Sequence, residues 1–284
     1  MGKAIIIENT DFSGNSIGKV TFIEDSRKQA NKIVSNYQSR IGSTEFSGAL
    51  KKMVKALIDN DIYDGLNGIY PIIGTTQEQL CADLMGKHNV VIDSQLLEPS
   101  TNVLMRTAII ATNVPSAYDF AQSRVTLNNR ISSIGATAFV RMNKKHTSGG
   151  VTIGIIDSNP QTPNPAKIGS YTTDVTAYFY GGKRVSCGTF PDGFATLGLH
   201  LRAGNKADVY VNSLKEEKSG NSVYDVYQLN YSLGAYSTGS AAAYSSNSQA
   251  ASGDISFYLF GNVDDSKMEI LKAIVDEFIA SKGI

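Results

Sequence analysis

The sequence has no tryptophan, and it has only two cysteines, three histidines and seven prolines among its 284 residues. Tryptophan is the favoured platform in many sugar-binding sites, so its absence argues against a strong lectin, although tyrosine also stacks on sugars. Cys81 and Cys187 lie far apart and form no CxxC motif, so they cannot build a zinc site alone. We expect two reduced, separate thiols in buried or half-buried positions.

Long apolar runs and an excess of either charge are also missing. No segment approaches the roughly 18 apolar residues of a membrane span, and the start of the chain lacks the basic and apolar regions of a signal peptide. Lys and Arg total 26, as do Asp and Glu, so net charge gives no drive toward nucleic acid or an anionic membrane. The sequence therefore predicts neither partner, and it predicts a protein made and kept in a cytoplasm unless it leaves by lysis.

From about residue 70 onward the sequence has the pattern of a β protein. The chain holds 26 glycines and 14 tyrosines, a composition typical of strands joined by many turns. In 206–212 apolar Ala207, Val209 and Val211 alternate with Asp208, Tyr210 and Asn212. Many short segments of this kind predict an antiparallel sandwich or barrel. The candidate strands are 88–92, 102–112, 123–127, 134–142, 151–157, 172–180, 184–190, 195–202, 206–212, 223–232 and 254–260.

Residues 1–24 are interpreted as an extended N-terminal arm. The arm starts with a short apolar β-type run made of Ile5, Ile6 and Ile7. Phe12 lies in the polar break that follows, and residues 20–23 resume an extended pattern. Two short strands cannot bury enough surface alone, so we expect the arm to lie on another surface.

Residues 25–70 are predicted to be a helical segment, because apolar residues recur at i, i+3, i+4 and i+7 in 30–37 and again in 46–58. Residues 71–284 are then expected to form the β-sandwich and to end in a helix. That last helix has a capping-box pattern, in which Ser266 and Glu269 are the expected partners. A globule of this size needs no metal or disulfide staple, so no cofactor is predicted.

Several short motifs match a catalytic or metal-binding pattern and fail in their context. Residues 14–18 fit G-x-S-x-G, but an extended segment follows where a nucleophile elbow needs a helix. Residues 59–64 resemble the start of an EF-hand loop, with Asp where glycine is required. The histidines form no i, i+2 or i, i+4 pair, so no metal site or His-based acid–base pair is predicted.

Paired carboxylates matter because some jelly-roll sandwiches hydrolyse glycosides with two closely spaced acids. The predicted strands carry isolated acids such as Asp174 and Asp208. Glu216 and Glu217 are adjacent, so on a strand they would point to opposite faces. We interpret them as a solvated hairpin tip between two lysines, and we predict that the protein is not an enzyme.

Several segments, taken in their order, resemble one family. In the C-terminal half these are the strand at 208–212, Leu233-Gly234-Ala235-Tyr236, the strand at 257–261 and the acidic start of the last helix at 264–268. Upstream, residues 69–77 read IYPIIGTTQ, and residues 7–20 resemble a leader segment. This order is similar to concanavalin-like (laminin-G-like) jelly-roll domains in virion proteins of tailed phages of gut bacteria, crAss-like phages included.

The resemblance implies a virion component: a head fibre, an appendage or a decoration protein, assembled in the host cytoplasm. It implies other virion proteins (capsid, portal or tail) as partners, and a homo-oligomer, dimer or trimer. For some members of the family, it also implies glycan binding through the loops of the sandwich. The E-x-D-x-x-E motif of concanavalin-like glucanases is absent from this sequence, so no catalytic residue carries over.

Two sets of candidate residues follow. The virion-anchoring set lies in the arm, where unpaired strand edges favour β-augmentation by a partner; it comprises Ile5, Ile6, Ile7 and Phe12. The glycan-binding set combines aromatic faces with amide groups in loops, together with the proline-rich loop at 158–167; it comprises Tyr236, Tyr244, Asn221 and Tyr224. The alternative hypothesis is a carbohydrate-binding, lectin-like module without a structural role, and a glycoside hydrolase is disfavoured.

Overall fold

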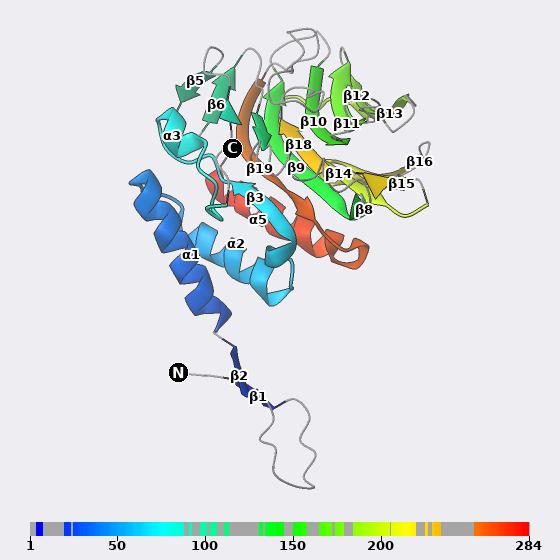
Figure 1. Cartoon of the computed structure of the whole chain (residues 1–284). Coiled ribbons are helices and arrows are strands. Elements are labelled where there is room, and N and C mark those ends of the chain that lie inside the picture. The colour runs from blue at the N-terminus through cyan, green and yellow to red at the C-terminus, as the bar shows by residue number, and fades with distance from the viewer. Residues whose placement is uncertain are drawn as a thin grey trace, which may run out of the picture.

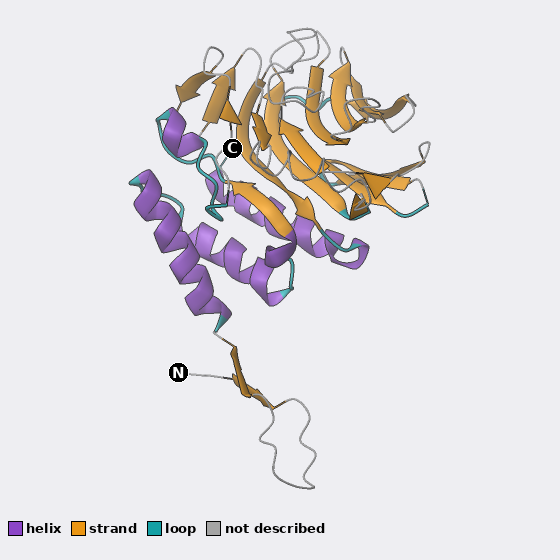
Figure 2. Cartoon of the chain, in the orientation of Figure 1, coloured by secondary structure: helices purple, strands orange, loops and turns teal. Residues whose placement is uncertain are grey.

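The computed structural model describes residues 4–7, 20–23, 25–87, 91–92, 97–100, 103–106, 111–113, 131–132, 134–144, 150–157, 165–171, 174–178, 184–204, 206–219, 225–226, 229–233 and 253–283. Within these ranges two large antiparallel sheets are stacked, and helices cover the outer face of one of them (Figures 1 and 2). The prediction of a mainly β sandwich with a helical segment and a C-terminal helix is confirmed.

The eight-stranded sheet is the centre of the molecule. Its strand order is β16-β15-β14-β9-β19-β6-β5, and β3 also pairs with β19. The bounds are β3 Leu66–Tyr70, β5 Leu97–Ser100, β6 Val103–Arg106, β9 Ala136–Lys144, β14 Phe194–Arg202, β15 Lys206–Val211, β16 Leu214–Ser219 and β19 Gly253–Asn262.

The seven-stranded sheet has the order β13-β12-β11-β10-β18-β7-β4. Its strands are β4 Val91–Ile92, β7 Ala111–Asn113, β10 Gly150–Asp157, β11 Pro165–Tyr171, β12 Asp174–Tyr178, β13 Arg184–Thr189 and β18 Leu229–Leu233. Two small pairs stand beside these sheets: β1 Ala4–Ile7 with β2 Val20–Ile23, and β8 Ile131–Ser132 with β17 Asp225–Val226.

Two cores lie on the two faces of the eight-stranded sheet. Between the sheets, alternate residues of β15 (Ala207, Val209 and Val211) pack with residues of β9, β14 and the facing strands. On the other face, Tyr210 packs with the helices, so the predicted alternation is confirmed. A bulge after Ile255 changes the alternation of β19, and Phe257 therefore faces the helices.

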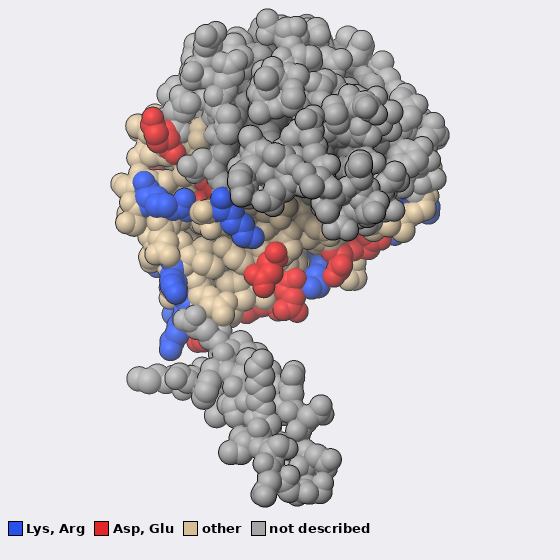
Figure 3. Space-filling view, in the orientation of Figure 1, with Lys and Arg blue, Asp and Glu red and all other residues tan. Residues whose placement is uncertain are grey.

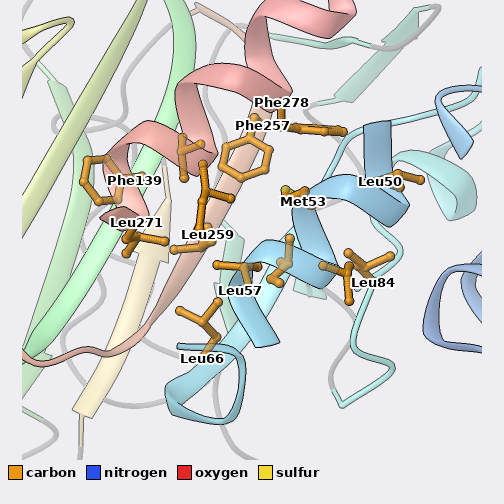
Figure 4. Close-up of a cluster of buried hydrophobic side chains, with 14 of the residues drawn as sticks. Leu50, Met53, Leu57, Leu66, Leu84, Phe139, Phe257, Leu259, Leu271 and Phe278 are labelled. Atoms are coloured by element: carbon orange, nitrogen blue, oxygen red, sulfur yellow. The ribbon is translucent and has the colours of Figure 1, made fainter. Parts of the chain in front are cut away.

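The helices form one layer against this second face. α1 (Ser26–Ile41) and α2 (Ser47–Asp59) follow the arm, and α5 (Met268–Lys282) closes the chain after the 3₁₀ turn η4 (Asp265–Lys267). Figure 4 shows how their apolar side chains meet the sheet, with Leu57 and Leu271 next to Leu259. The short elements η1 (Tyr63–Gly65) and α3 (Gln77–Leu80) lie around β3. No helix in the described ranges has both the length and the apolar character to cross a membrane.

The helix starts differ from the sequence expectation. α5 has no side-chain cap, so the capping box expected from Ser266 and Glu269 is wrong. The Glu269 carboxylate instead accepts a hydrogen bond from Lys215 of β16, 2.8 Å away. By contrast α1 has a capping side chain, because Asp25 accepts a hydrogen bond from the backbone of Arg27 at 2.9 Å.

The strand predictions hold where hydrophobic alternation is strong. The expected strands at 134–142, 151–157, 184–190, 195–202, 206–212 and 254–260 all contain observed strands, whereas 123–127 lies outside the described residues. The hairpin tip expected around Glu216 is wrong, since this segment forms β16. The last five residues of the predicted helical segment form β3, and the end of the 158–167 loop opens β11. The boundaries at residues 24 and 70 stay predictions.

Candidate functional site

A row of polar side chains crosses four strands on the helix-facing side of the eight-stranded sheet. Thr137, His200, Asp208 and Glu217 stand directly opposite one another on β9, β14, β15 and β16. Opposite residues share one face of a sheet, and this face carries Tyr210 against the helices. Thr137, His200 and Asp208 are buried, while Glu217 on the edge strand is exposed. Three polar groups in one buried row need partners, because unpaired polar burial is costly.

His200 connects the sheet to the start of the C-terminal helix. Its Nδ1 lies 2.8 Å from Oγ1 of Thr137, and its Nε2 lies 2.8 Å from Oδ1 of Asp265 in η4. Burial lowers the pKa of His200, and the hydrogen bond to Asp265 opposes this effect. A neutral ring with its proton on Nε2 donates to the Asp265 carboxylate, and the single proton of the Thr137 hydroxyl has two acceptors within 2.8 Å, Nδ1 of His200 and the carbonyl oxygen of Gly135.

Arg202 holds three carboxylates together next to this histidine. Its guanidinium donates to Asp265 at 3.0 Å, to Glu217 at 2.8 Å and to Asp208 at 3.3 Å. Hydrogen bonding to Asp265 and the charge of Asp208 raise the pKa of Arg202. Partial burial alone would raise the pKa of Asp265, but the hydrogen bonds from His200 and Arg202 lower it overall.

Lys215 completes the network from the edge strand. Its Nζ lies 3.2 Å from Asp208 and 2.8 Å from Glu269 in the first turn of α5. The hydrogen bond to Glu269 raises the pKa of Lys215. These contacts tie β14, β15 and β16 to η4 and α5, so the network fixes the start of the last helix on the sheet.

The order Thr137, His200, Asp265 is that of nucleophile, base and carboxylate in hydrolases. The Thr137 hydroxyl is fully buried, however, and it also lies 2.8 Å from the carbonyl oxygen of Gly135. Sulfur of Met268 lies 3.7 Å from the same hydroxyl on the α5 side. A substrate carbonyl has no approach to this oxygen. The arrangement is therefore a structural junction.

A surface pocket of 290 Å³ lies between α2 and α5, away from this network. Met53 and Phe278 contribute apolar walls, and Ser281 a polar one. Lys52 and Glu277 also line the pocket, and they form an ion pair between the two helices. The one acid in its lining, Glu277, is engaged in this ion pair.

Lys282, the last residue of α5, enters a group of three backbone carbonyls. Its Nζ donates to the carbonyl oxygens of Pro71 at 2.8 Å, Ile72 at 2.9 Å and Ser256 at 2.6 Å. Burial lowers the pKa of Lys282 to about 7, and the charge of Glu45 opposes this. The end of the helix is thus attached both to β19 and to the segment after β3.

The predicted site residues divide into two groups. Ile5, Ile6 and Ile7 lie in β1, as the β-type run predicts. The other candidates fall outside the described residues: Phe12, Tyr236, Tyr244, Asn221 and Tyr224. Their proposed roles stay predictions.

The remaining residue predictions concern the thiols and metal binding. Both cysteines are free and buried, as expected. No group of potential metal ligands occurs among the described residues. The contact between His200 and Asp265 is not predictable from the sequence, because 65 residues separate the two.

A scan of protein-family models and a search of curated proteins both find no match. Among solved structures, the chain is similar to CBM40 of the Ruminococcus gnavus IT-sialidase (TM-score 0.43, 9% identity, covering 59% of this chain and 92% of that one). It is also similar to the ligand-binding domain of botulinum neurotoxin serotype D in complex with N-acetylneuraminic acid (TM-score 0.46, 11% identity, 77% and 52%). A third is the leech intramolecular trans-sialidase (TM-score 0.43, 11% identity), of whose chain only 27% is covered, by 61% of this one.

The predicted fold, a mainly β antiparallel sandwich with helices, is seen in the structure itself. None of these likenesses carries a ligand, an activity or a site residue over to this chain. No comparison bears on the phage origin, which stays a prediction.

Proposed function

We propose that this protein is a non-enzymatic structural component of a phage particle, a head fibre, appendage or decoration protein that is attached through its N-terminal arm. The observation that carries the attachment role is the pairing of the arm. β1 and β2 form a two-stranded sheet that is joined to no other described strand. A lone two-stranded hairpin is at best marginally stable in water, so it gains stability from a partner.

The register of this hairpin supports the role. Ile5 pairs with Phe22 and Ile7 pairs with Val20, which places four apolar residues on one face of the ribbon. Figure 1 shows the ribbon beyond the N-terminal end of α1, away from both large sheets. An apolar ribbon that pairs with no other described strand is suited to pairing with a strand of another protein.

The test compares particle incorporation of the full chain and of variants in phage particles whose genome encodes it. We expect the truncation that removes residues 1–24, and the double variant Ile5→Glu with Phe22→Glu, to fold normally by circular dichroism and to be missing from purified particles. Thr21→Glu is the matched control, since Thr21 pairs with Ile6 on the opposite face of the ribbon. Normal incorporation of the truncation would sink the attachment role, and absence of the full chain from particles would sink the virion assignment.

The non-enzymatic part of the proposal is supported by the positions of the acids. Glu216 stands opposite Val209, on the side of the core between the sheets, whereas Glu217 stands opposite Asp208 on the helix side. Glu216 forms an ion pair with Lys218. Two acids on opposite faces cannot act together on one glycosidic bond. Release of reducing sugar from a panel of polysaccharides by the purified chain would contradict this part.

The second candidate function is a carbohydrate-binding, lectin-like module. It is favoured by the layer order: both faces of the eight-stranded sheet are occupied, one by the core between the sheets and the other by helices. All described helices lie on the side of this sheet (Figure 2). A glycan would therefore meet the seven-stranded sheet or segments beside it. In the sequence, the predicted candidates fall between β16 and β17 and between β18 and β19, outside the described residues.

Calorimetric titration of the full chain with sialyllactose and with extracted host polysaccharide tests this second function. The sialylated probe is chosen because the toxin domain was solved with N-acetylneuraminic acid. Binding that is lost in Tyr236→Ala or Tyr244→Ala, and kept in the surface control Asn36→Ala, would support the glycan site. No heat of binding with either probe would leave the attachment role as the function.

A further inference from the structure

Six residues that run from the end of β3 to the start of α3, at 71–76, connect the two cores of the molecule. We call this segment the strap. Ile72 belongs to the core between the sheets, whereas Ile73 belongs to the helix-side core. All four residues of 71–74 are buried. The strap is therefore packed into both cores, although it lies in neither a strand nor a helix.

The first side chain that holds the strap is Lys282, from the last turn of α5. Its ammonium donates to the carbonyl oxygens of Pro71 and Ile72, at 2.8 and 2.9 Å, and to that of Ser256 in β19, at 2.6 Å. Figure 3 shows Lys and Arg side chains on the surface of the helical layer, whereas Lys282 is half-buried. This ammonium attaches the start of the strap to both β19 and α5.

The second side chain that holds the strap is Gln79 of α3. Its Oε1 accepts hydrogen bonds from the backbone amides of Thr75 and Thr76, at 2.8 and 3.1 Å. Its Nε2 donates to the carbonyl oxygen of Ile41, 2.7 Å away at the end of α1. The start of the strap is thus held by a side chain of α5, and its end by a side chain of α3.

Backbone strain gathers around the Lys282 ammonium. Ile72 has a φ of 52°, in the left-handed region that a β-branched residue rarely adopts. Phe46, at the start of α2, has a φ of 55°, and the centroid of its ring lies 6.0 Å from Nζ of Lys282. Two of the four non-glycine residues with positive φ in the described ranges therefore contact one ammonium. Such conformations persist only where the surrounding structure holds them.

We propose that the strap is a conformational device that opens as one local unit and is kept closed by Lys282 and Gln79. Withdrawal of Lys282 removes the donor that the carbonyl oxygens of Pro71 and Ile72 share, and it lets Ile72 leave its left-handed conformation. Local units of this kind open at a lower free-energy cost than global unfolding. The device lies in the helical layer and the sheet, so it depends neither on the attachment role nor on glycan binding.

Cys81 supplies a chemical probe of this opening. It is a free cysteine, 7% exposed, and it belongs with Ile72 and Leu80 to the core between the sheets. An alkylating reagent reaches a buried thiol when the segment around it opens. Cys187 in β13 is free and 7% exposed as well, so it serves as the reference thiol in the same molecule.

Two measurements on the full chain test the proposal: iodoacetamide labelling of each cysteine, quantified by peptide mass spectrometry, and hydrogen–deuterium exchange. In Lys282→Met we expect Cys81 to be labelled at least about tenfold faster than in the unmodified chain, because three charge-assisted hydrogen bonds are lost. Labelling of Cys187 should change by less than about twofold. The amides of Thr75 and Thr76 should exchange at least about tenfold faster, although the substitution does not touch their bonds to Gln79.

Lys267→Met is the matched control, since Lys267 also donates to a backbone carbonyl, that of Asp61, at 2.8 Å. It should leave the labelling of both thiols unchanged. Gln79→Met removes the second side chain that holds the strap, so it should also accelerate the labelling of Cys81. This variant keeps the proposal testable if Lys282→Met does not fold.

Four results would overturn the proposal. Equal acceleration at Cys81 and Cys187 would show global unfolding in place of a local unit. Faster labelling of Cys81 with unchanged exchange at the Thr75 and Thr76 amides would show that the strap does not open as one unit. The same acceleration in the Lys267 control would remove the specific role of Lys282. Unchanged labelling of Cys81 in both strap variants would show that neither side chain keeps the strap closed.

Discussion

Replacement of His200 by alanine tests whether the polar network holds the last helix on the sheet. The imidazole is fully buried and links Thr137 on one side with Asp265 on the other. The Thr137 hydroxyl keeps the Gly135 carbonyl as a partner, 2.8 Å away, and the half-exposed Asp265 carboxylate keeps Arg202. The main losses are therefore two hydrogen bonds and the space that the ring fills.

The expected cost follows from these two losses. A hydrogen bond contributes about 0.5–1.5 kcal/mol net to stability, and an unfilled cavity adds to the loss of a buried side chain. We expect His200→Ala to lower the free energy of unfolding by about 2–4 kcal/mol. Asp265→Asn keeps an oxygen that accepts the Nε2 proton, so it should cost about 0.5–1.5 kcal/mol.

The pH dependence has a fixed sign. The pKa of His200 in the folded chain lies below its ordinary value of 6.5, because burial disfavours the charged ring. Between these two pKa values the unfolded state binds more protons than the folded state, so stability falls as the pH drops below about 6.5. The contribution of the neutral His200 to stability is fully present above that pH. His200→Ala should remove this component and flatten the profile in that window.

Urea unfolding followed by tyrosine fluorescence measures both effects, since the chain has no tryptophan. Unfolding curves for the unmodified chain, His200→Ala and Asp265→Asn are compared at neutral pH and at several lower values. A His200→Ala chain within about 0.5 kcal/mol of the original, the range of ordinary surface substitutions, would refute the reasoning. An unchanged pH profile in that variant would refute the linkage.

Three further predictions use the same unfolding assay. Leu57 is fully buried between α2 and the sheet, so Leu57→Ala should lower the free energy of unfolding by about 2–5 kcal/mol. Leu214 is 67% exposed, so Leu214→Ala should change it by no more than about 0.5 kcal/mol. Equal effects of the two variants would contradict the helix-side core. Gly65→Ala would press a methyl group onto the backbone of β19 and should lower the free energy of unfolding by about 1–3 kcal/mol. Gly48 in α2 has open space around it, so Gly48→Ala should raise the free energy of unfolding by about 0.5 kcal/mol. The reverse order would refute the close approach at η1. Lys282→Met removes the donor shared by three carbonyls and should cost about 1–3 kcal/mol; a neutral result would show that water replaces the ammonium.

The sequence predicted the elements whose patterns are strongly periodic. Residues 46–58 have helical spacing throughout, and α2 buries Leu50, Met53, Val54 and Leu57 as that spacing requires. β16 was missed because four of its six residues are charged and all but Lys218 are exposed. An edge strand with charged side chains is a common protection against unwanted pairing, but its sequence cannot be told from that of a polar turn.

The polar network was not predictable for a different reason. The partners of His200 come from β9 and η4, at sequence separations of 63 and 65 residues. Local periodicity places a residue on a strand face, but it says nothing about which distant turn lies over that face. The failed capping box has the same cause, because Lys215 binds the Glu269 carboxylate that the local pattern assigned to the helix start.

The helices and the eight-stranded sheet share the helix-side core, and this decides how attachment at the arm would act. Leu50 and Leu57 of α2 belong to the same buried cluster as Leu66 of β3 and Phe257 of β19. Lys282 and the Lys215–Glu269 contact fix the two ends of α5 to the sheet. Since α1 packs on α2 through this cluster, α1, α2, α5 and the eight-stranded sheet form one packed unit. Under the proposed attachment, a partner that binds the arm would therefore hold this unit through α1.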